Sequence, residues 1–371
     1  MVRKLLLALM TLLAALISAG CWDAIDINNK NITTLVAVDK QEDEYVFYVE
    51  IPGIANGSGN DENGGTRYSI ETGRGATFAQ AREDLNSKMD KPIFLGTVRT
   101  LVLSESLAQD DISKYLYRLQ SIPDYRKTVG VVTTRSPVET LLAVQPENNV
   151  SVGYAIEDTA ETLFAEGEAV LTTTSEILEW LYSDNVSFII PNVDETDGNI
   201  SLNGYTVIQD GHSAGYIPAQ RAKGLVCFLN PAAKWRYVVP YGGRNEATVE
   251  ATLKSKRIQP RKTEKGWMLD TSFVFDAIVM YKDTETPLND NALFEINDEL
   301  QKLLAADIET AVMQTREFGC EYLGFDDAFR ISFPNEYEKM DWRTAYMRMA
   351  VRLSVKSTLD PGGMMDFEQK K

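Results

Sequence analysis

The strongest constraint on the fold is a pattern of alternating apolar and polar residues in the last third of the chain. It runs through residues 248–254, 267–281 and 346–356, where apolar side chains take every second position and mainly polar or charged side chains lie between them. Alternation with a period of two places the apolar side chains of a strand on one face of a sheet. Sheets with one apolar and one solvated face are typically antiparallel, so these residues predict an antiparallel sheet.

A long amphipathic helix is predicted between the second and third of these strands, over residues 293–317. Its apolar residues recur at helical spacing along one stripe: Ile296, Leu300, Leu303, Leu304, Ile308, Ala311 and Val312. A helix with one apolar stripe and a sheet with one apolar face bury these surfaces against each other. We therefore predict a C-terminal α+β domain over residues 246–371.

The first half of the chain predicts strands and helices in alternation, without a repeat of fixed length. Strands are expected at residues 45–51, 98–103, 129–133 and 187–190. Helices between them begin at capping boxes such as Thr77 with Gln80, where side chains satisfy the first N–H groups of a helix. This order predicts an N-terminal mixed α/β domain over residues 21–195.

The residues that follow predict a middle segment or small domain over residues 196–245. The polar stretch 192–199 is typical of a boundary loop, and a hairpin with its turn at Asp210-Gly211 comes after it. A short helix is expected over residues 220–229. The chain is thus predicted to be a multidomain mixed α/β or α+β protein of two to three domains, with mostly antiparallel or mixed sheets and packed helices.

The charge balance restricts the partners of this chain. Its 371 residues carry 37 basic against 54 acidic side chains, which gives a net charge of −17. Because phosphate neutralisation needs a basic surplus, this balance argues against nucleic-acid binding. Anionic lipid also repels an acidic body, so charge alone would not hold the protein at a membrane.

The first residues have the layout of a signal peptide. A basic start precedes a 13-residue apolar run, residues 5–17, which is shorter than the roughly 20 residues of a membrane-spanning helix. The small residues 18–20, followed by Cys21, resemble a bacterial lipobox. We predict export, removal of residues 1–20, and S-diacylglycerol on Cys21, with or without N-acylation. An ordinary secreted protein with a cysteine at this position is the alternative.

Two further cysteines, Cys227 and Cys320, are too few for a disulfide framework. Cys227 lies in the apolar run 225–229, where a buried thiol is expected. A Cys227–Cys320 bridge stays open at this point, because sequence does not supply the geometry on which a disulfide depends.

No group of residues in the sequence predicts catalysis or metal binding. The single histidine, His212, lies in the predicted hairpin turn, where an exposed residue is expected. The acidic pairs Asp110-Asp111 and Asp326-Asp327 are expected at a helix start and in a loop. Two acidic stretches with glycine, residues 61–64 and 194–198, lack ligands at positions that a calcium loop requires. Phosphate-binding and nucleophile motifs do not occur. We therefore predict that the protein is not an enzyme and needs no cofactor or metal.

An ordered set of segments resembles the lipoprotein C subunits of bacterial spore germinant receptors, the Ger(x)C family. The segments are GCWDAIDIN (20–28), FLGTVRTLVLSESLA (94–108), IPDYRK (122–127), IIPNV with ISLNGYTVIQDG (189–211), and CEYLGFDDAFRISFP (320–334), followed by Trp342. Each segment by itself is only weakly specific for this family. Their order along nearly the whole mature chain is what makes the resemblance specific.

The resemblance implies a three-domain mixed α/β lipoprotein on the outer face of the spore inner membrane. It implies assembly with an A subunit and a transporter-like B subunit into a receptor for nutrient germinants, and a requirement for this subunit in germination signalling. Cys21 is the one functional position that it carries over, and it implies no catalytic residue. It leaves open which germinant is sensed and whether this subunit binds it.

From these residues we expect a tethering and assembly role. A lipid on Cys21 would hold the acidic body at the bilayer and raise its effective concentration near membrane partners. The glycine-rich loop 53–65 and the charges near Arg126 are candidate contact regions.

Two other classes of protein share the predicted export. A lipid-anchored solute-binding protein of an importer is the alternative, but its usual two parallel-sheet lobes conflict with the alternation after residue 247. An exported hydrolase is a third interpretation, which rests on export alone.

Overall fold

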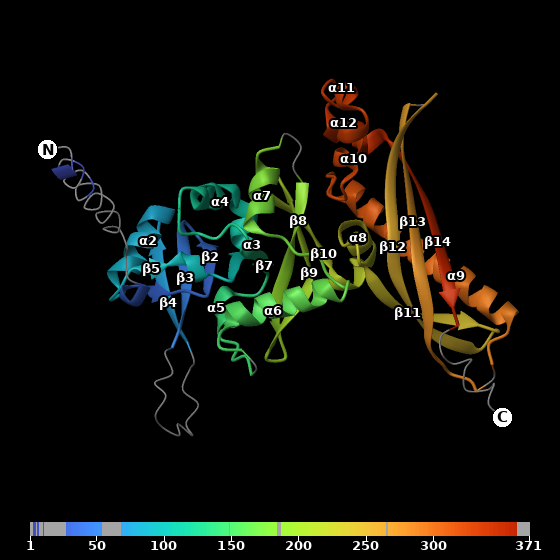
Figure 1. Cartoon of the computed structure of the whole chain (residues 1–371), viewed down its shortest axis with the longest axis horizontal. Helices are drawn as coiled ribbons and strands as arrows, with labels where there is room; N and C mark the ends of the chain where they lie inside the picture. Colours follow the sequence, from blue (N-terminus) through green and yellow to red (C-terminus); the bar gives the residue numbers. More distant parts are fainter. Residues whose placement is uncertain are drawn as a thin grey trace.

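Two large β-sheets organise the chain, and helices pack on their apolar faces (Figure 1). The structure is a computed structural model. It describes residues 27–53, 68–147, 149–183, 187–264, 266–285 and 287–361, together with Arg3, Lys4, Leu6 and Met10. Among these residues, none of the helices is both long enough and apolar enough to cross a bilayer.

The larger sheet has eight strands, and its central strands run parallel. In spatial order they are β10 (His212–Pro218), β9 (Asn199–Gln209), β8 (Ser187–Thr196), β7 (Gly130–Thr134), β6 (Thr100–Ser104), β2 (Leu35–Gln41), β3 (Glu44–Pro52) and β4 (Tyr68–Gly75). Antiparallel pairings add β3 and β4 at one edge and β9 and β10 at the other. The first residues of β2 are buried in succession, which fits a parallel strand that is covered on both faces.

Helices cover both faces of this sheet. One face carries α2 (Phe78–Ser87), α3 (Glu105–Asp110), α4 (Ser113–Gln120) and α7 (Thr174–Leu181); the other carries α5 (Val138–Leu142) and α6 (Val152–Ala165). Val36 and Val38 belong to the first core, whereas Leu35 and Ala37 belong to the second. Successive residues of β2 thus alternate between the two cores, as the geometry of a strand requires.

The smaller sheet has four strands, in the order β11 (Lys234–Tyr241), β12 (Asn245–Thr263), β13 (Gly266–Lys282) and β14 (Ala350–Asp360). Its apolar face packs against α9 (Asp290–Glu317), which buries Ile296, Leu300 and Leu304. The predicted α+β unit with one long amphipathic helix is confirmed. The short helices α10 (Phe325–Ser332), α11 (Pro334–Tyr337) and α12 (Trp342–Arg348) follow α9.

The fourth strand of the smaller sheet differs from the prediction in direction and in its start. β14 runs parallel to β13, whereas β11, β12 and β13 pair antiparallel. A parallel neighbour needs a crossover connection, and α9 supplies one. Tyr346 lies in α12 rather than in a strand, because Asp341 caps that helix by accepting a hydrogen bond from the Thr344 N–H.

A shared hydrophobic core joins the two sheets through α8 (Lys223–Leu229). This core extends from Tyr205 of β9 to Phe273 of β13, and the ring of Phe228 stands edge-on to Phe273 at 5.0 Å between ring centres. The segment 196–245 supplies β9 and β10 to the larger sheet and β11 to the smaller one. The domain boundaries after residues 195 and 245 stay predictions.

The predicted boundary loop over residues 192–199 is wrong, because these residues form the end of β8 and the turn into β9. Asp194 is 9% exposed, and its carboxylate accepts hydrogen bonds from the Thr134 hydroxyl (2.8 Å) and from the N–H groups of Arg135 and Ser136 (2.9 Å each). Polar residues can continue a buried strand when their hydrogen bonds are satisfied.

The remaining short elements of the described chain are two strands and three 3-10 helices. The strands β1 (Asn31–Ile32) and β5 (Ile93–Phe94) pair in parallel. The 3-10 helices are η2 (Ile27–Asn29), η3 (Leu95–Thr97) and η4 (Ala219–Arg221).

Candidate functional site

The predicted lipid-attachment residue, Cys21, lies outside the described residues, and its modification stays a prediction. The described body begins at Ile27, four residues before β1, and the partner strand of β1, β5, lies near one end of the molecule in Figure 1. The start is fixed to the body by the β1–β5 pairing. The Lys30 ammonium also lies 3.3 Å from the Asp124 carboxylate and 4.7 Å from the centre of the Phe94 ring.

The acidic pairs singled out in the sequence lie at helix ends. Asp110 ends α3, and Asp111 accepts a hydrogen bond from the Ser113 N–H at 2.9 Å, where α4 begins. Asp326 and Asp327 lie in the first turn of α10, so the expected loop at this position is a helix start instead. Asp111, Asp326 and Asp327 are therefore placed where a helix dipole stabilises a carboxylate, whereas Asp110 ends α3 and does not lie at the expected helix start.

The other residues singled out in the sequence do not come together in one site. His212 is exposed at the start of β10. Arg126 lies 3.9 Å from the Glu157 carboxylate, and of the loop 53–65 only Gly53 belongs to the described residues. Within the described ranges, no group of three or more His, Cys, Asp and Glu side chains is arranged to hold a metal ion.

Cys227 and Cys320 are free thiols in the structure, so the open question of a bridge between them is answered. Both are buried. Burial raises the pKa of Cys227 to about 12 and the pKa of Cys320 to about 11. Because the thiolate is the reactive form, both side chains are expected to be inert toward electrophiles near neutral pH.

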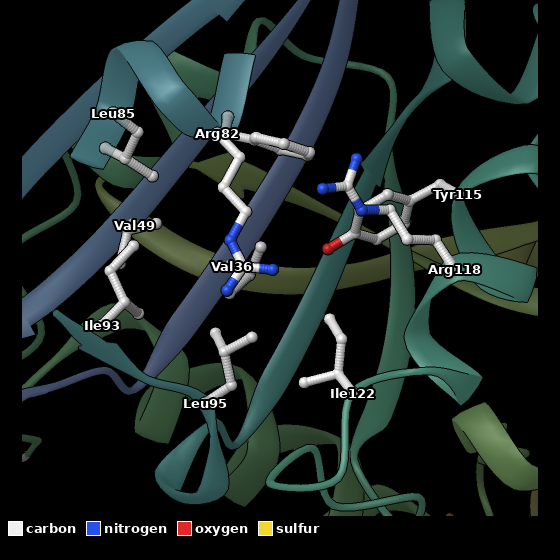
Figure 2. A pocket seen from close by; sticks show the side chains of 10 residues that line it. Val36, Val49, Arg82, Leu85, Ile93, Leu95, Tyr115, Arg118 and Ile122 are labelled. Carbon is white, nitrogen blue, oxygen red and sulfur yellow. The ribbon is translucent and has the colours of Figure 1, made fainter. Parts of the chain in front are cut away.

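An apolar pocket opens between α2 and α4, above the face of the larger sheet (Figure 2). Val36 and Val49 come from strands β2 and β3, Leu85 from α2, Tyr115 from α4 and Ile93 from β5. The cavity volume is about 40 Å³. That is room for about three water-sized groups, so the pocket takes a small apolar group rather than a whole ligand.

Two arginines line the same pocket, Arg82 from α2 and Arg118 from α4 (Figure 2). Each lies three residues from an apolar lining residue of its own helix, Leu85 and Tyr115, and this spacing puts both side chains on one side of the helix. Burial raises the pKa of Tyr115, and the charges of both arginines oppose part of that rise. Sequence reasoning missed this site because its two charges are 36 positions apart and belong to no motif.

Neither guanidinium group has a hydrogen bond or an ion pair with another residue in the described part of the chain. Arg82 is exposed and Arg118 is half-buried. The described residues that line the pocket include no aspartate or glutamate. Two guanidinium groups beside an apolar floor therefore form a site that suits an anion attached to an apolar group.

A larger cleft, of about 600 Å³, lies between the two sheets and their helices. One wall carries Trp180 of α7 and Phe188 of β8, and the other carries Tyr322 and Arg330 beside and within α10. Four carboxylate residues complete the lining: Glu176, Glu179, Asp326 and Asp327. The Tyr322 hydroxyl is buried without a hydrogen-bond partner among the described residues. The size falls within the range typical of ligand pockets.

The second wall of this cleft depends on Glu321, a buried carboxyl group that holds the first turn of α10. Its oxygens accept hydrogen bonds from the N–H groups of Leu323 (2.5 Å) and Asp326 (3.1 Å). Burial, together with the nearby Asp326 carboxylate, raises the pKa of Glu321 above the ordinary range. Burial also raises the pKa of Asp326 and lowers the pKa of Lys256, which faces Glu321 from β12.

We expect the stability of the protein to fall as the pH rises from about 5 to about 8, partly because of Glu321. A carboxyl group with a raised pKa in the folded state stabilises that state fully below the unfolded pKa. This contribution is lost as the pH rises toward the folded pKa. Glu321→Gln, which carries no titratable group, should reduce the decline by at least about 1 kcal/mol in urea unfolding measured at both pH values. The exposed Glu336→Gln is the control, and an unchanged decline in Glu321→Gln would contradict the assignment.

Two family models match the chain, and between them they cover most of it. One is described as the spore germination protein N-terminal domain and matches residues 23–195. The other is described as spore germination B3/GerAC like, C-terminal, and matches residues 203–363.

Curated relatives come from Bacillus subtilis (strain 168). Spore germination protein KC is 22% identical over 380 residues, which cover 94% of this chain and 93% of the relative. The putative spore germination protein YfkR is 21% identical and covers 95% of this chain and 96% of its own. Spore germination protein A3 is 26% identical over 53% of each chain.

The crystal structure of the GerBC protein is similar in fold. It superposes with a TM-score of 0.55 at 14% sequence identity, over 87% of this chain and 96% of that one. At this level of identity the likeness concerns the fold.

Proposed function

The chain belongs to the Ger(x)C family of spore germinant receptor subunits, and from this we propose that it is the lipid-anchored C subunit of such a receptor. The proposal places it, after export, on the outer face of the spore inner membrane, where it serves receptor assembly and germination signalling. One observation carries the proposal. The two matched regions follow, in order, a signal-peptide layout that ends at Cys21.

The anchor explains how a protein of this charge stays at a membrane. A net charge of −17 opposes adsorption to anionic lipid. Diacylglycerol on Cys21 brings two acyl chains, which suffice for stable attachment, whereas a single chain binds only marginally. Attachment also turns weak contacts with membrane partners into effective ones, because it raises the local concentration of the body.

Cys21→Ala should move the protein from the membrane fraction to the soluble fraction without unfolding it. The substitution removes the thiol that receives the lipid and leaves every described residue unchanged. Partition into Triton X-114, labelling with a radioactive fatty acid, and the intact mass of the mature chain report the change. Cys227→Ala is the matched control, because it removes a buried thiol and should leave partition and labelling intact. A Cys21→Ala protein that is still labelled and still membrane-bound would refute the anchor.

Receptor assembly is tested by affinity purification of the tagged native chain from detergent extracts of spore membranes. The proposal expects the integral A and B subunits of one receptor to co-purify with it. Recovery of the chain without either subunit, under conditions that keep the A and B subunits together, would contradict the assembly role.

A further inference from the structure

The pocket with Arg82 and Arg118 is an unusual place on a strongly acidic protein. Two acidic groups at this end of the larger sheet are paired with lysines: Asp84 with Lys88 at 2.6 Å and Asp124 with Lys30 at 3.3 Å. The two arginines have no such partner among the described residues. They therefore leave positive charge beside an apolar opening.

The position of this pocket relative to the predicted anchor suggests what it faces. Cys21 lies six residues before Ile27, and an extended chain of that length spans at most about 20 Å. The start of the described body is pinned to the pocket wall, because β1 pairs with β5 and Ile93 of β5 lines the pocket. An anchor at Cys21 thus keeps the bilayer surface close to this end of the protein.

The net charge of the protein does not prevent contact at this end. Free charges that lie more than about 8–10 Å from a surface are largely screened at physiological ionic strength. The acidic residues of the smaller sheet and its helices belong to the other half of an elongated molecule (Figure 1). The charges nearest to the bilayer therefore decide the orientation, and Arg82 and Arg118 are among them.

We propose that this pocket binds the headgroup of an anionic phospholipid and so orients the anchored body on the bilayer. The phosphate lies between the guanidinium groups of Arg82 and Arg118, and the adjoining glycerol and first methylene groups contact Val36, Leu85 and the other apolar lining residues. The acyl chains stay in the membrane, since the cavity of about 40 Å³ is too small for them. This inference rests on the proposed function, because it takes the anchor as the reason why the pocket meets lipid.

The contribution of Arg82 and Arg118 to the affinity for an anionic membrane follows from their two charges. One basic residue near an anionic surface contributes about 5-fold in affinity, so the pair contributes about 30-fold. The double variant Arg82→Glu/Arg118→Glu should remove this contribution and add repulsion. Arg244→Glu/Arg348→Glu makes the same change in net charge at exposed positions of the other half and is the matched control.

In the test, the chain is attached chemically to vesicles, and the segments that lipid protects from hydrogen–deuterium exchange are measured. The chain from Cys21 onward is coupled through Cys21 to a maleimide lipid. This coupling is selective because Cys227 and Cys320 are buried thiols with raised pKa values. Vesicles contain phosphatidylcholine alone or a mixture with phosphatidylglycerol, and hydrogen–deuterium exchange is followed by mass spectrometry. A third arm uses soluble glycerol phosphate without vesicles.

We expect slower exchange in α2 and α4 on vesicles with phosphatidylglycerol than on phosphatidylcholine. The slowing should be lost in Arg82→Glu/Arg118→Glu and kept in the control pair, with near-UV circular dichroism showing that all variants are folded. Equal exchange on both vesicles, or native slowing in Arg82→Glu/Arg118→Glu, would overturn the inference. Equal slowing by glycerol phosphate alone would overturn lipid as the ligand. Since the maleimide replaces the biological anchor, none of these outcomes depends on acylation of Cys21 in cells.

Discussion

Replacing Glu50 by alanine is expected to lower the free energy of unfolding by about 3–5 kcal/mol. Glu50 is fully buried, and its carboxylate accepts three hydrogen bonds. The donors are the Thr34 hydroxyl at 2.7 Å and the N–H groups of Val152 and Gly153 at 2.6 and 3.0 Å. Val152 and Gly153 begin α6, so the carboxylate also neutralises the positive end of that helix dipole.

The cost is large because alanine leaves three buried donors without an acceptor and opens a cavity beside them. Urea unfolding followed by circular dichroism measures it. Glu44→Ala, at an exposed position of the same strand, is the control and should change stability by less than about 0.5 kcal/mol. A loss in Glu50→Ala as small as that of the control would show that the carboxylate does not hold α6.

Gly224→Ala is the second substitution for which we expect a large loss, of about 3 kcal/mol. A methyl group at Gly224 of α8 would lie 1.9 Å from the Asp307 carbonyl oxygen and 2.9 Å from the Ile308 Cα. Both atoms belong to the backbone of α9, which cannot move without disturbing the core that joins the two sheets. Either α8 shifts away from α9 or the core is strained.

Whether Gly224→Ala lowers or raises the free energy of unfolding tests the close contact between α8 and α9. In an unpacked helix, alanine is more favourable than glycine by about 1 kcal/mol, so a stabilising effect would contradict the close contact between α8 and α9. Thermal or urea unfolding gives the comparison. Gly130→Ala is the control, because the nearest atom to its new methyl group is the Arg99 carbonyl oxygen at 3.9 Å, an ordinary contact.

Much of the fold could be predicted from residue periodicity. The alternation in residues 248–254 and 267–281 corresponds to β12 and β13, and the apolar stripe of residues 293–317 corresponds to α9. These elements are long and half-buried, so one face of each is marked by apolar residues over many positions. The hairpin turn at Asp210-Gly211 was also visible, because a left-handed turn favours glycine and aspartate.

The elements that were missed depend on contacts between distant residues. The end of β8 is polar, and it continues as a strand because Thr134 and its neighbours satisfy Asp194 from 58 to 60 positions away. The parallel direction of β14 follows from the crossover through α9, which local alternation does not encode. Tyr346 is helical because Asp341 caps α12.

The candidate sites formed by distant residues could not be predicted from the sequence either. Arg82 and Arg118 become neighbours only because α2 and α4 pack side by side on the same sheet face, and sequence spacing does not show this. Glu50 and α6 are about 100 positions apart. By contrast, lipid attachment at Cys21 is predicted from a local pattern, because such a signal is read from the unfolded chain rather than from the fold.

The most direct test of the proposed role is nutrient-triggered germination of spores whose native chain is replaced by the Cys21→Ala variant. If the protein acts as a lipid-anchored receptor subunit, these spores should germinate as poorly as spores that lack the chain, although the variant is folded and produced at the native level. Germination at the native rate, with an unacylated chain detected by intact mass in the same spores, would contradict it.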